Sequence, residues 1–181
     1  KNPKQVSDNF GGFNSVLDPQ ACEDYTCVGG PPGTFQWTDG VLYFVFVDRF
    51  LDGDPSNNGS PSPGVQAPAD YHGGDYAGVT AKINEGYFND LGVNILWLTV
   101  PADNTEQPGK GVGNDPYLYS GYHGYWPKDM EKTEEHFGSM ADLKALVDAA
   151  HAKNIRVILD YAMIHVHNSS AVYTAHPDWF W

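Results

Sequence analysis

Three aromatic side chains and a histidine lie within five residues of one glycine-spaced stretch, residues 120–129. Tyr122, His123, Tyr125 and Trp126 offer flat apolar faces with hydrogen-bonding groups at their edges. A sugar ring needs this combination, because one of its faces is apolar while its hydroxyls require polar partners. The alternative is a loop held in place by buried aromatic side chains. Composition alone does not separate these two interpretations.

A second stretch is rich in oxygen ligands. Residues 52–58 read Asp-Gly-Asp-Pro-Ser-Asn-Asn, and the same long segment ends at Gly-Gly-Asp, residues 73–75. Calcium takes six to eight oxygen ligands from carboxylates, amides and backbone carbonyls. The spacing is not that of an EF-hand, and a solvated turn rich in Asp and Asn is the alternative. The segment is therefore a candidate calcium loop.

Charge and cysteine content restrict the class of partner and the compartment. The 181-residue chain has a formal net charge of -13, which disfavours nucleic acid and anionic membranes as partners. No apolar run reaches the ~18 residues of a membrane span, and no signal peptide is visible. Cys22 and Cys27 favour a local disulfide in an exported protein over free thiols. The start at Lys1, without methionine, predicts a processed or trimmed N-terminus.

The candidate sites are placed by a repeating order of strands and helices. Apolar, β-rich runs predict three buried parallel strands: residues 41–47, 93–100 and 155–160. Between them, apolar residues at helical spacing predict two helices: residues 79–91, capped by Asp75 or Thr80 and closed by Gly92, and residues 139–153, opened by Ser139 and Asp142.

The loops that follow the strands are long and carry the unusual residues, whereas the loops that precede them are short. This asymmetry predicts a (β/α) barrel with its site at the carboxyl ends of the strands. A doubly wound sheet is the alternative, and the absence of a glycine-rich loop after the first strand weakens it. A barrel needs eight such units, so we expect an α/β fold that forms the N-terminal portion, about three βα units, of a TIM (β/α)8 barrel. We divide the chain into a lead-in of loops and short strands (1–40), three barrel strands (41–165) and the start of an inserted segment (166–181).

An ordered set of motifs resembles glycoside hydrolase family 13, the α-amylase family, which includes the cyclodextrin glucanotransferases. The matching segments run in the family's order: Tyr43, Asp48-Arg49-Phe50 and Asp52-Gly53-Asp54; Gly73-Gly74-Asp75; Leu91-Gly92-Val93 and Leu96-Trp97-Leu98; Tyr122-His123-Gly124-Tyr125; Phe137-Gly138; Asp160 and His165. Each segment alone is weak, but their joint order and spacing are specific.

The resemblance implies a retaining enzyme acting on α-1,4-glucans, by hydrolysis or transglycosylation. The family's three catalytic carboxylates follow its fourth, fifth and seventh strands, so we expect no catalytic residue in this chain. Four residues match family positions that contact the reacting sugar: His123, Tyr125, Asp160 and His165. The resemblance gives Tyr125 a stacking role and His123 a hydroxyl contact, and it implies that Asp160 holds an active-site arginine and backbone groups.

The same resemblance assigns calcium ligands to the oxygen-rich loop. They are Asp52, Asp54, Asn57, Asn58, the Gly73 carbonyl and Asp75. One departure concerns a second, central calcium, because Ile164 stands where the family has a ligating asparagine. We expect that central site to be absent, weakened or rebuilt from residues such as Asn168.

The expected partners are an α-glucan and the remainder of the protein's own barrel, with no nucleic acid or membrane, and the expected location is extracellular or periplasmic. Two other functions remain open: a non-catalytic carbohydrate-binding relative, and a calcium-stabilised module without a sugar site. Ile164 and the missing catalytic strands favour the first of these alternatives.

Overall fold

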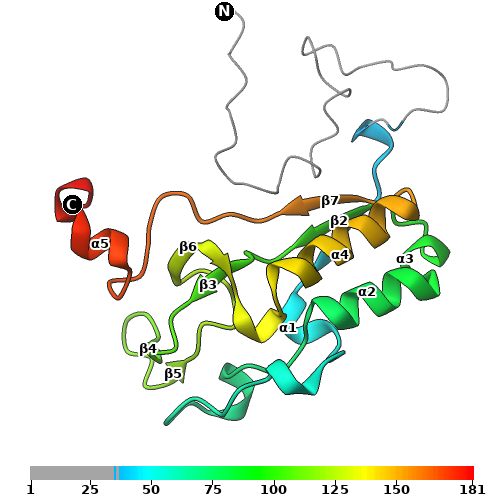
Figure 1. Cartoon of the computed structure of the whole chain (residues 1–181). Coiled ribbons are helices and arrows are strands. Elements are labelled where there is room, and N and C mark those ends of the chain that lie inside the picture. Colours follow the sequence, from blue (N-terminus) through cyan, green and yellow to red (C-terminus); the bar gives the residue numbers. More distant parts are fainter. Residues whose placement is uncertain (1–34, 36) are drawn as a thin grey trace, which may run out of the picture. The chain divides into compact units, whose positions relative to one another are not determined.

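A computed structural model describes residue 35 and residues 37–181 (Figure 1). The chain divides into two compact units, residues 1–40 and 41–181. In the first unit, the described part contains the 3-10 turn η2 (Trp37–Asp39), and the ring of Phe35 meets Trp37 edge-on. The predicted disulfide and most of the predicted lead-in lie outside the described residues.

Three parallel strands form the sheet of the second unit, in the order β1 (Leu42–Val45), β2 (Ile95–Leu98) and β7 (Arg156–Leu159). The register places Phe44 beside Trp97, and Trp97 beside Ile158. All three predicted strands exist but are shorter than predicted. The first ends early because Val47 begins the short helix α1 (Val47–Phe50), and its buried position explains why the apolar run continues past the strand.

A helical segment connects each pair of consecutive strands, as predicted, but the first segment differs from its predicted form. It consists of two helices, α2 (Tyr76–Glu85) and α3 (Tyr87–Asp90), where one helix over residues 79–91 was predicted. Gly86 separates them with a φ of 87°, a left-handed conformation that ends a helix at little cost for glycine. Asp75 caps α2, because its Oδ1 accepts a hydrogen bond of 2.6 Å from Gly78 N. The second helix, α4 (Met140–Ala152), begins with the predicted capping box of Ser139 and Asp142.

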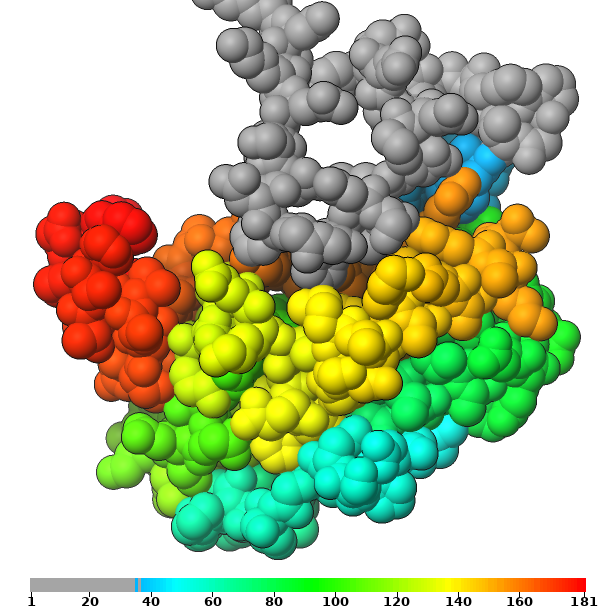
Figure 2. Space-filling view, viewed as in Figure 1, coloured from blue at the N-terminus to red at the C-terminus, as the bar shows by residue number. Residues whose placement is uncertain are grey.

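The helices cover one face of the sheet. α2 and α4 pack against each other, and the space-filling view shows them side by side on the surface (Figures 1 and 2). Their buried side chains form the core with the strand residues of that face: Val79, Ile83, Leu143, Leu146, Val147, Val45, Leu96 and Leu98. Helices on one face only are expected for a barrel segment, whereas a doubly wound sheet carries helices on both faces.

The long loop expected after the second strand, residues 101–137, contains two small antiparallel sheets, so the expectation of a loop without strands was wrong. One sheet pairs β3 (Ala102–Asn104) with β6 (Pro127–Thr133), and the other pairs β4 (Gly109–Lys110) with β5 (Leu118–Tyr119). β3 and β6 are mostly polar and β4 and β5 have two residues each, so these strands lack the apolar runs that reveal β1, β2 and β7. They nevertheless give the long loop a fixed shape.

The remaining elements are short helical turns: η3 (Pro55–Asn57), η4 (Ala67–Ala69), η5 (Glu135–Phe137), α5 (Ala171–Ala175) and η6 (Pro177–Trp179). Within the described residues, no helix is both long and apolar enough to span a membrane.

Candidate functional site

Tyr125 and Asp160 meet although 35 positions separate them in the chain. Asp160 directly follows β7, and its backbone N–H donates to Leu98 O at the end of β2, 3.0 Å away. Its carboxylate accepts hydrogen bonds from the Tyr125 hydroxyl and, at 2.8 Å, from Tyr161 N. Parallel strands bring their carboxyl ends to one edge, so the loop after β2 reaches the residue after β7 there.

His165 joins the same group through the backbone of Tyr125. Its Nε2 lies 2.8 Å from the Tyr125 carbonyl oxygen. A carbonyl can only accept, so Nε2 carries the proton in this contact. The structure therefore brings three of the predicted sugar-contact residues together: Tyr125, Asp160 and His165.

The fourth predicted residue, His123, contacts Tyr125 from the other side. Its Nδ1 accepts a hydrogen bond of 3.0 Å from Tyr125 N, and the two rings lie nearly parallel, with centroids 6.0 Å apart. Burial lowers the pKa of His123 to about 4, so the ring is neutral near pH 7. Because Nδ1 accepts, the proton of the neutral ring is on Nε2, which makes that nitrogen a donor.

The turn that presents these side chains depends on Gly124. Its φ is 87°, and a Cβ added there would lie 2.9 Å from Val100 Cβ. A larger residue would therefore be strained and would clash with the end of the β2 segment. Trp126 lies behind the site: its ring meets His123 edge-on at 4.6 Å, and its backbone N–H donates to Asn104 Oδ1 at 2.8 Å.

Arg49 supports the aromatic stretch; the sequence placed it in the motif Asp48-Arg49-Phe50 but gave it no role in the site. Its guanidinium carbon lies 4.0 Å from the centre of the Tyr122 ring, and its Nε lies 3.3 Å from Asp48 Oδ2. Asp48 is buried, and burial raises the pKa of its carboxyl, while the His72 amide and Arg49 act in the opposite direction. The sequence signal that could have pointed to Arg49 is the charged pair Asp48-Arg49, which directly follows the apolar run of residues 41–47.

Two oxygen atoms of the candidate calcium loop are buried without a hydrogen-bond partner among the described residues. They are the Oδ1 atoms of Asn57 and Asn58. Asn58 Nδ2 donates to Asp52 Oδ2 at 2.7 Å, and Asn58 Oδ1 lies against Gly73, where an added Cβ would be 2.6 Å away. A buried unpaired amide oxygen is costly, and a cation would satisfy it.

The other candidate ligands in that loop already make hydrogen bonds. Asp54 Oδ1 accepts from Ser56 N at 3.0 Å and from Ser56 Oγ at 2.6 Å. Both carboxylate oxygens of Asp75 accept from backbone amides of Gly53, Asp54 and Gly78. Asp75 therefore ties the loop to the start of α2. All six predicted ligands belong to one folded loop, and the two asparagines offer its unsatisfied oxygens.

Ile164, which replaces the family's central-calcium asparagine, is 93% exposed. It supplies no ligand atom, and Asn168 is also exposed. The loss or weakening of the central calcium site stays a prediction.

The parallel sheet is covered by helices on one face, and polar side chains gather at the carboxyl ends of its strands. These features are typical of the (β/α)-barrel class of proteins. Residues 44–178 match the family model "Alpha amylase, catalytic domain", and the chain belongs to the α-amylase family. The family and fold class predicted from the motifs are thereby confirmed.

Curated relatives include two cyclomaltodextrin glucanotransferases. That of Geobacillus stearothermophilus is 43% identical over 137 residues, which are 74% of this chain and 19% of the relative. That of Bacillus licheniformis is 46% identical over 128 residues, 69% of this chain and 17% of the relative. The chain thus spans about a fifth of the length of these relatives.

Solved structures show the same likeness. The cyclomaltodextrin glucanotransferase CldA matches with a TM-score of 0.62 at 40% identity, over 71% of this chain and 26% of its own. An Anoxybacillus α-amylase matches with a TM-score of 0.66 at 36% identity, over 81% of this chain and 29% of its own.

Proposed function

We propose that the protein acts on α-1,4-glucans with retention, as a hydrolase or transglycosylase, and that this chain supplies part of its sugar-binding site. The observation that carries the proposal is the group formed by His123, Tyr125, Asp160 and His165 at the carboxyl ends of β2 and β7. Its relatives are named as a cyclomaltodextrin glucanotransferase and an α-amylase, and these names support the same substrate class.

In this proposal the four residues bind and orient one glucose unit. The Tyr125 ring, 41% exposed, stacks on the apolar face of the sugar. Asp160 accepts a hydrogen bond from the Tyr125 hydroxyl, and His165 donates one to the Tyr125 carbonyl. The Tyr125 ring is therefore fixed before the substrate arrives. The Nε2–H of His123 donates to a sugar hydroxyl, such as that on C6.

Bond cleavage is assigned to residues outside this chain. Retaining cleavage needs two carboxyl groups about 5–5.5 Å apart across the scissile bond. Asp160 is the one carboxylate in the group, and its bonds to Tyr125 and Tyr161 suit a positioning role. By resemblance, the catalytic carboxylates follow later strands of the barrel.

We also propose that the loop of Asp52, Asp54, Asn57, Asn58, Gly73 and Asp75 holds Ca²⁺. The unsatisfied oxygens of Asn57 and Asn58 are hard ligands, and the neighbouring Asp52 and Asp54 supply negative charge. The ion would neutralise this charge and fix the loop that packs on the start of α2. We further propose that the protein is exported, because a starch-sized substrate is found outside the cell. Recovery of the protein from the culture medium would test this.

Activity on maltoheptaose tests the proposed reaction. The intact protein is expected to release shorter or transferred α-glucan products, and Tyr125→Ala is expected to reduce kcat/KM about tenfold or more, since a stacking platform is lost. Tyr117→Ala removes another exposed tyrosine and serves as the matched control. Binding of maltoheptaose without any product would favour the non-catalytic alternative instead. If the protein shows no binding of maltoheptaose and releases no product, the proposal is refuted.

Calcium removal tests the proposed loop. EGTA is expected to lower the melting temperature of the intact protein, because an ion that binds only the folded state stabilises it. Asn58→Ala should shrink this calcium-dependent shift, whereas Asn114→Ala, at an exposed position, should leave it unchanged. An equal shift in wild type and Asn58→Ala would place the calcium elsewhere.

A further inference from the structure

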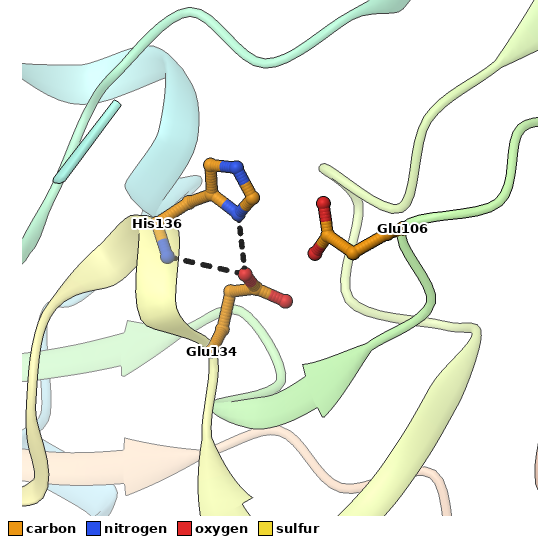
Figure 3. A group of neighbouring side chains, drawn as sticks. All are labelled: Glu106, Glu134 and His136. Carbon is orange, nitrogen blue, oxygen red and sulfur yellow. Dashed lines mark hydrogen bonds and ion pairs between the residues drawn. The ribbon is translucent and has the colours of Figure 1, made fainter. Parts of the chain in front are cut away.

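Glu106, Glu134 and His136 form a second polar cluster, separate from the candidate sugar site (Figure 3). Glu106 follows β3, Glu134 follows β6, and His136 lies in η5. One potential ligand atom from each residue lies within 4.8 Å of the other two. Glu134 and His136 are buried, whereas Glu106 is exposed. Neither the sequence motifs nor the proposed function uses these residues.

A metal ion could replace the proton that the buried pair of Glu134 and His136 shares, if the two side chains move slightly apart. Glu134 Oε1 lies 2.7 Å from His136 Nδ1 and accepts from His136 N at 3.1 Å, while Oε2 accepts from Asn104 N at 2.9 Å. A proton now lies between Nδ1 and Oε1. A metal ion at this place would bind both atoms and release the proton to solvent, and the bond from Asn104 could remain.

A buried hydroxyl beside the cluster makes no well-aligned hydrogen bond within the described residues, although the Glu134 side chain lies close enough to interact with it. The hydroxyl belongs to Tyr71, whose ring stacks on His136 with centroids 3.9 Å apart and planes 12° apart. Burial and then the negative charges of Glu134 and Glu106 raise the pKa of Tyr71, so its hydroxyl lies within the field of both carboxylates. A water molecule held by a metal ion would give this hydroxyl a well-aligned partner.

Solvent can reach the cluster through a cavity. Glu106 and His136 both line a hollow of about 430 Å³, together with residues of the 59–63 segment. Figure 3 shows the carboxylate of Glu106 directed toward Glu134. An ion therefore has an entry path and a source of water ligands.

We propose that Glu106, Glu134 and His136 bind a divalent transition metal ion, with Zn²⁺ as the best match. Calcium and magnesium take oxygen ligands, whereas an imidazole with two carboxylates suits zinc. With bonds of about 2.0–2.2 Å, tetrahedral ligand atoms lie roughly 3.3–3.6 Å apart. From a separation of up to 4.8 Å, Glu106 must therefore move inward by about 1.2–1.5 Å, which its exposed side chain permits. Glu134 Oε1 and His136 Nδ1, now 2.7 Å apart, must separate by about 0.6–0.9 Å, and water completes the shell. This site shares no ligand with the calcium loop, although Asn57 of that loop lines the same hollow, and it is independent of the proposed glucan activity.

Zinc titration of the metal-stripped intact protein, in excess Ca²⁺ to fill any calcium site, tests the proposal by calorimetry. The wild type is expected to bind one Zn²⁺ per chain at this cluster, and Glu106→Gln should weaken binding about tenfold or more. Glu131→Gln makes the same charge change at another exposed glutamate and should leave the affinity unchanged. Absence of saturable zinc binding, or equal affinities in wild type and Glu106→Gln, would overturn the proposal. So would an equal loss in both variants, which indicates a general charge effect.

Cobalt substitution gives a readout of the nitrogen ligand. Co²⁺ at the cluster should give visible d–d absorption in wild type, and His136→Gln should remove that absorption or shift it. Circular dichroism first establishes that His136→Gln is folded. If it is not, the calorimetric comparison of Glu106→Gln with Glu131→Gln decides the matter, since Glu106 is exposed. A folded His136→Gln with an unchanged cobalt spectrum would contradict the proposal.

Discussion

Tyr125 contributes two separable groups to the candidate site, a ring and a hydroxyl. The ring is exposed to a ligand, whereas the hydroxyl is already bonded to Asp160. Tyr125→Phe keeps the stacking surface and removes only the bond that orients it, a loss of about 1 kcal/mol. We therefore expect maltoheptaose affinity to fall about fivefold in Tyr125→Phe, measured by calorimetry. Unchanged affinity would show that Asp160 does not position the ring.

His123 gives the site a defined response to acid. Burial lowers its folded-state pKa to about 4 from the ordinary 6.5, so between these values the unfolded chain binds a proton that the folded chain does not. The stabilising contribution is therefore present above pH 6.5 and is lost as the pH falls toward 4. We expect the melting temperature of wild type to fall more steeply over this window than that of His123→Gln. Parallel curves would mean that His123 is not buried in its neutral form.

At the scale of elements, the start of α4 can be tested by its cap. Ser139 Oγ accepts from Asp142 N, and Asp142 Oδ2 accepts from Ser139 N at 2.8 Å. Ser139→Ala should cost about 1 kcal/mol and speed amide exchange in the first turns of α4 about fivefold. Lys144→Ala breaks an exposed pair with Asp148 on the same helix and should cost only about 0.3–0.5 kcal/mol. Equal exchange in both variants, measured by mass spectrometry, would contradict the capping account.

The same elements show what sequence reasoning can reach. The three strands, their order and the cap of α4 follow from local signals: apolar runs and a Ser-x-x-Asp spacing. The sheet of β3 and β6 does not, because its mostly polar strands depend on distant contacts such as Asn104 N to Glu134 Oε2. That Tyr125 and Asp160 both belong to the sugar site was implied by the family resemblance, whereas their hydrogen bond to each other required the fold. No motif marked His136.

At the scale of the molecule, one face of the sheet remains open within the described residues. Phe44 and Trp97 are neighbours on β1 and β2, with ring centroids 5.1 Å apart, and they are 43% and 37% exposed. Aromatic side chains on a barrel strand normally face a filled interior. The described sheet has three strands where a barrel has eight, so further strands are required to cover them.

The 181-residue chain by itself is therefore expected to have no glycosidase activity. It carries the group that we propose orients the sugar, but it lacks the strands that the family resemblance assigns to the catalytic carboxylates. The measurement is the release of reducing sugar from starch by the purified chain, shown free of host amylase. Activity under those conditions would mean that a carboxylate within this chain performs the reaction.

Calorimetric titration of the intact protein with maltoheptaose, beside the β-linked cellohexaose, tests the central claim most directly. The account predicts saturable binding of maltoheptaose, a loss of about tenfold or more in Tyr125→Ala, and no loss in the matched Tyr117→Ala. It also predicts no comparable binding of cellohexaose. Equal maltoheptaose affinity in wild type and Tyr125→Ala would contradict the assignment of this site to an α-glucan.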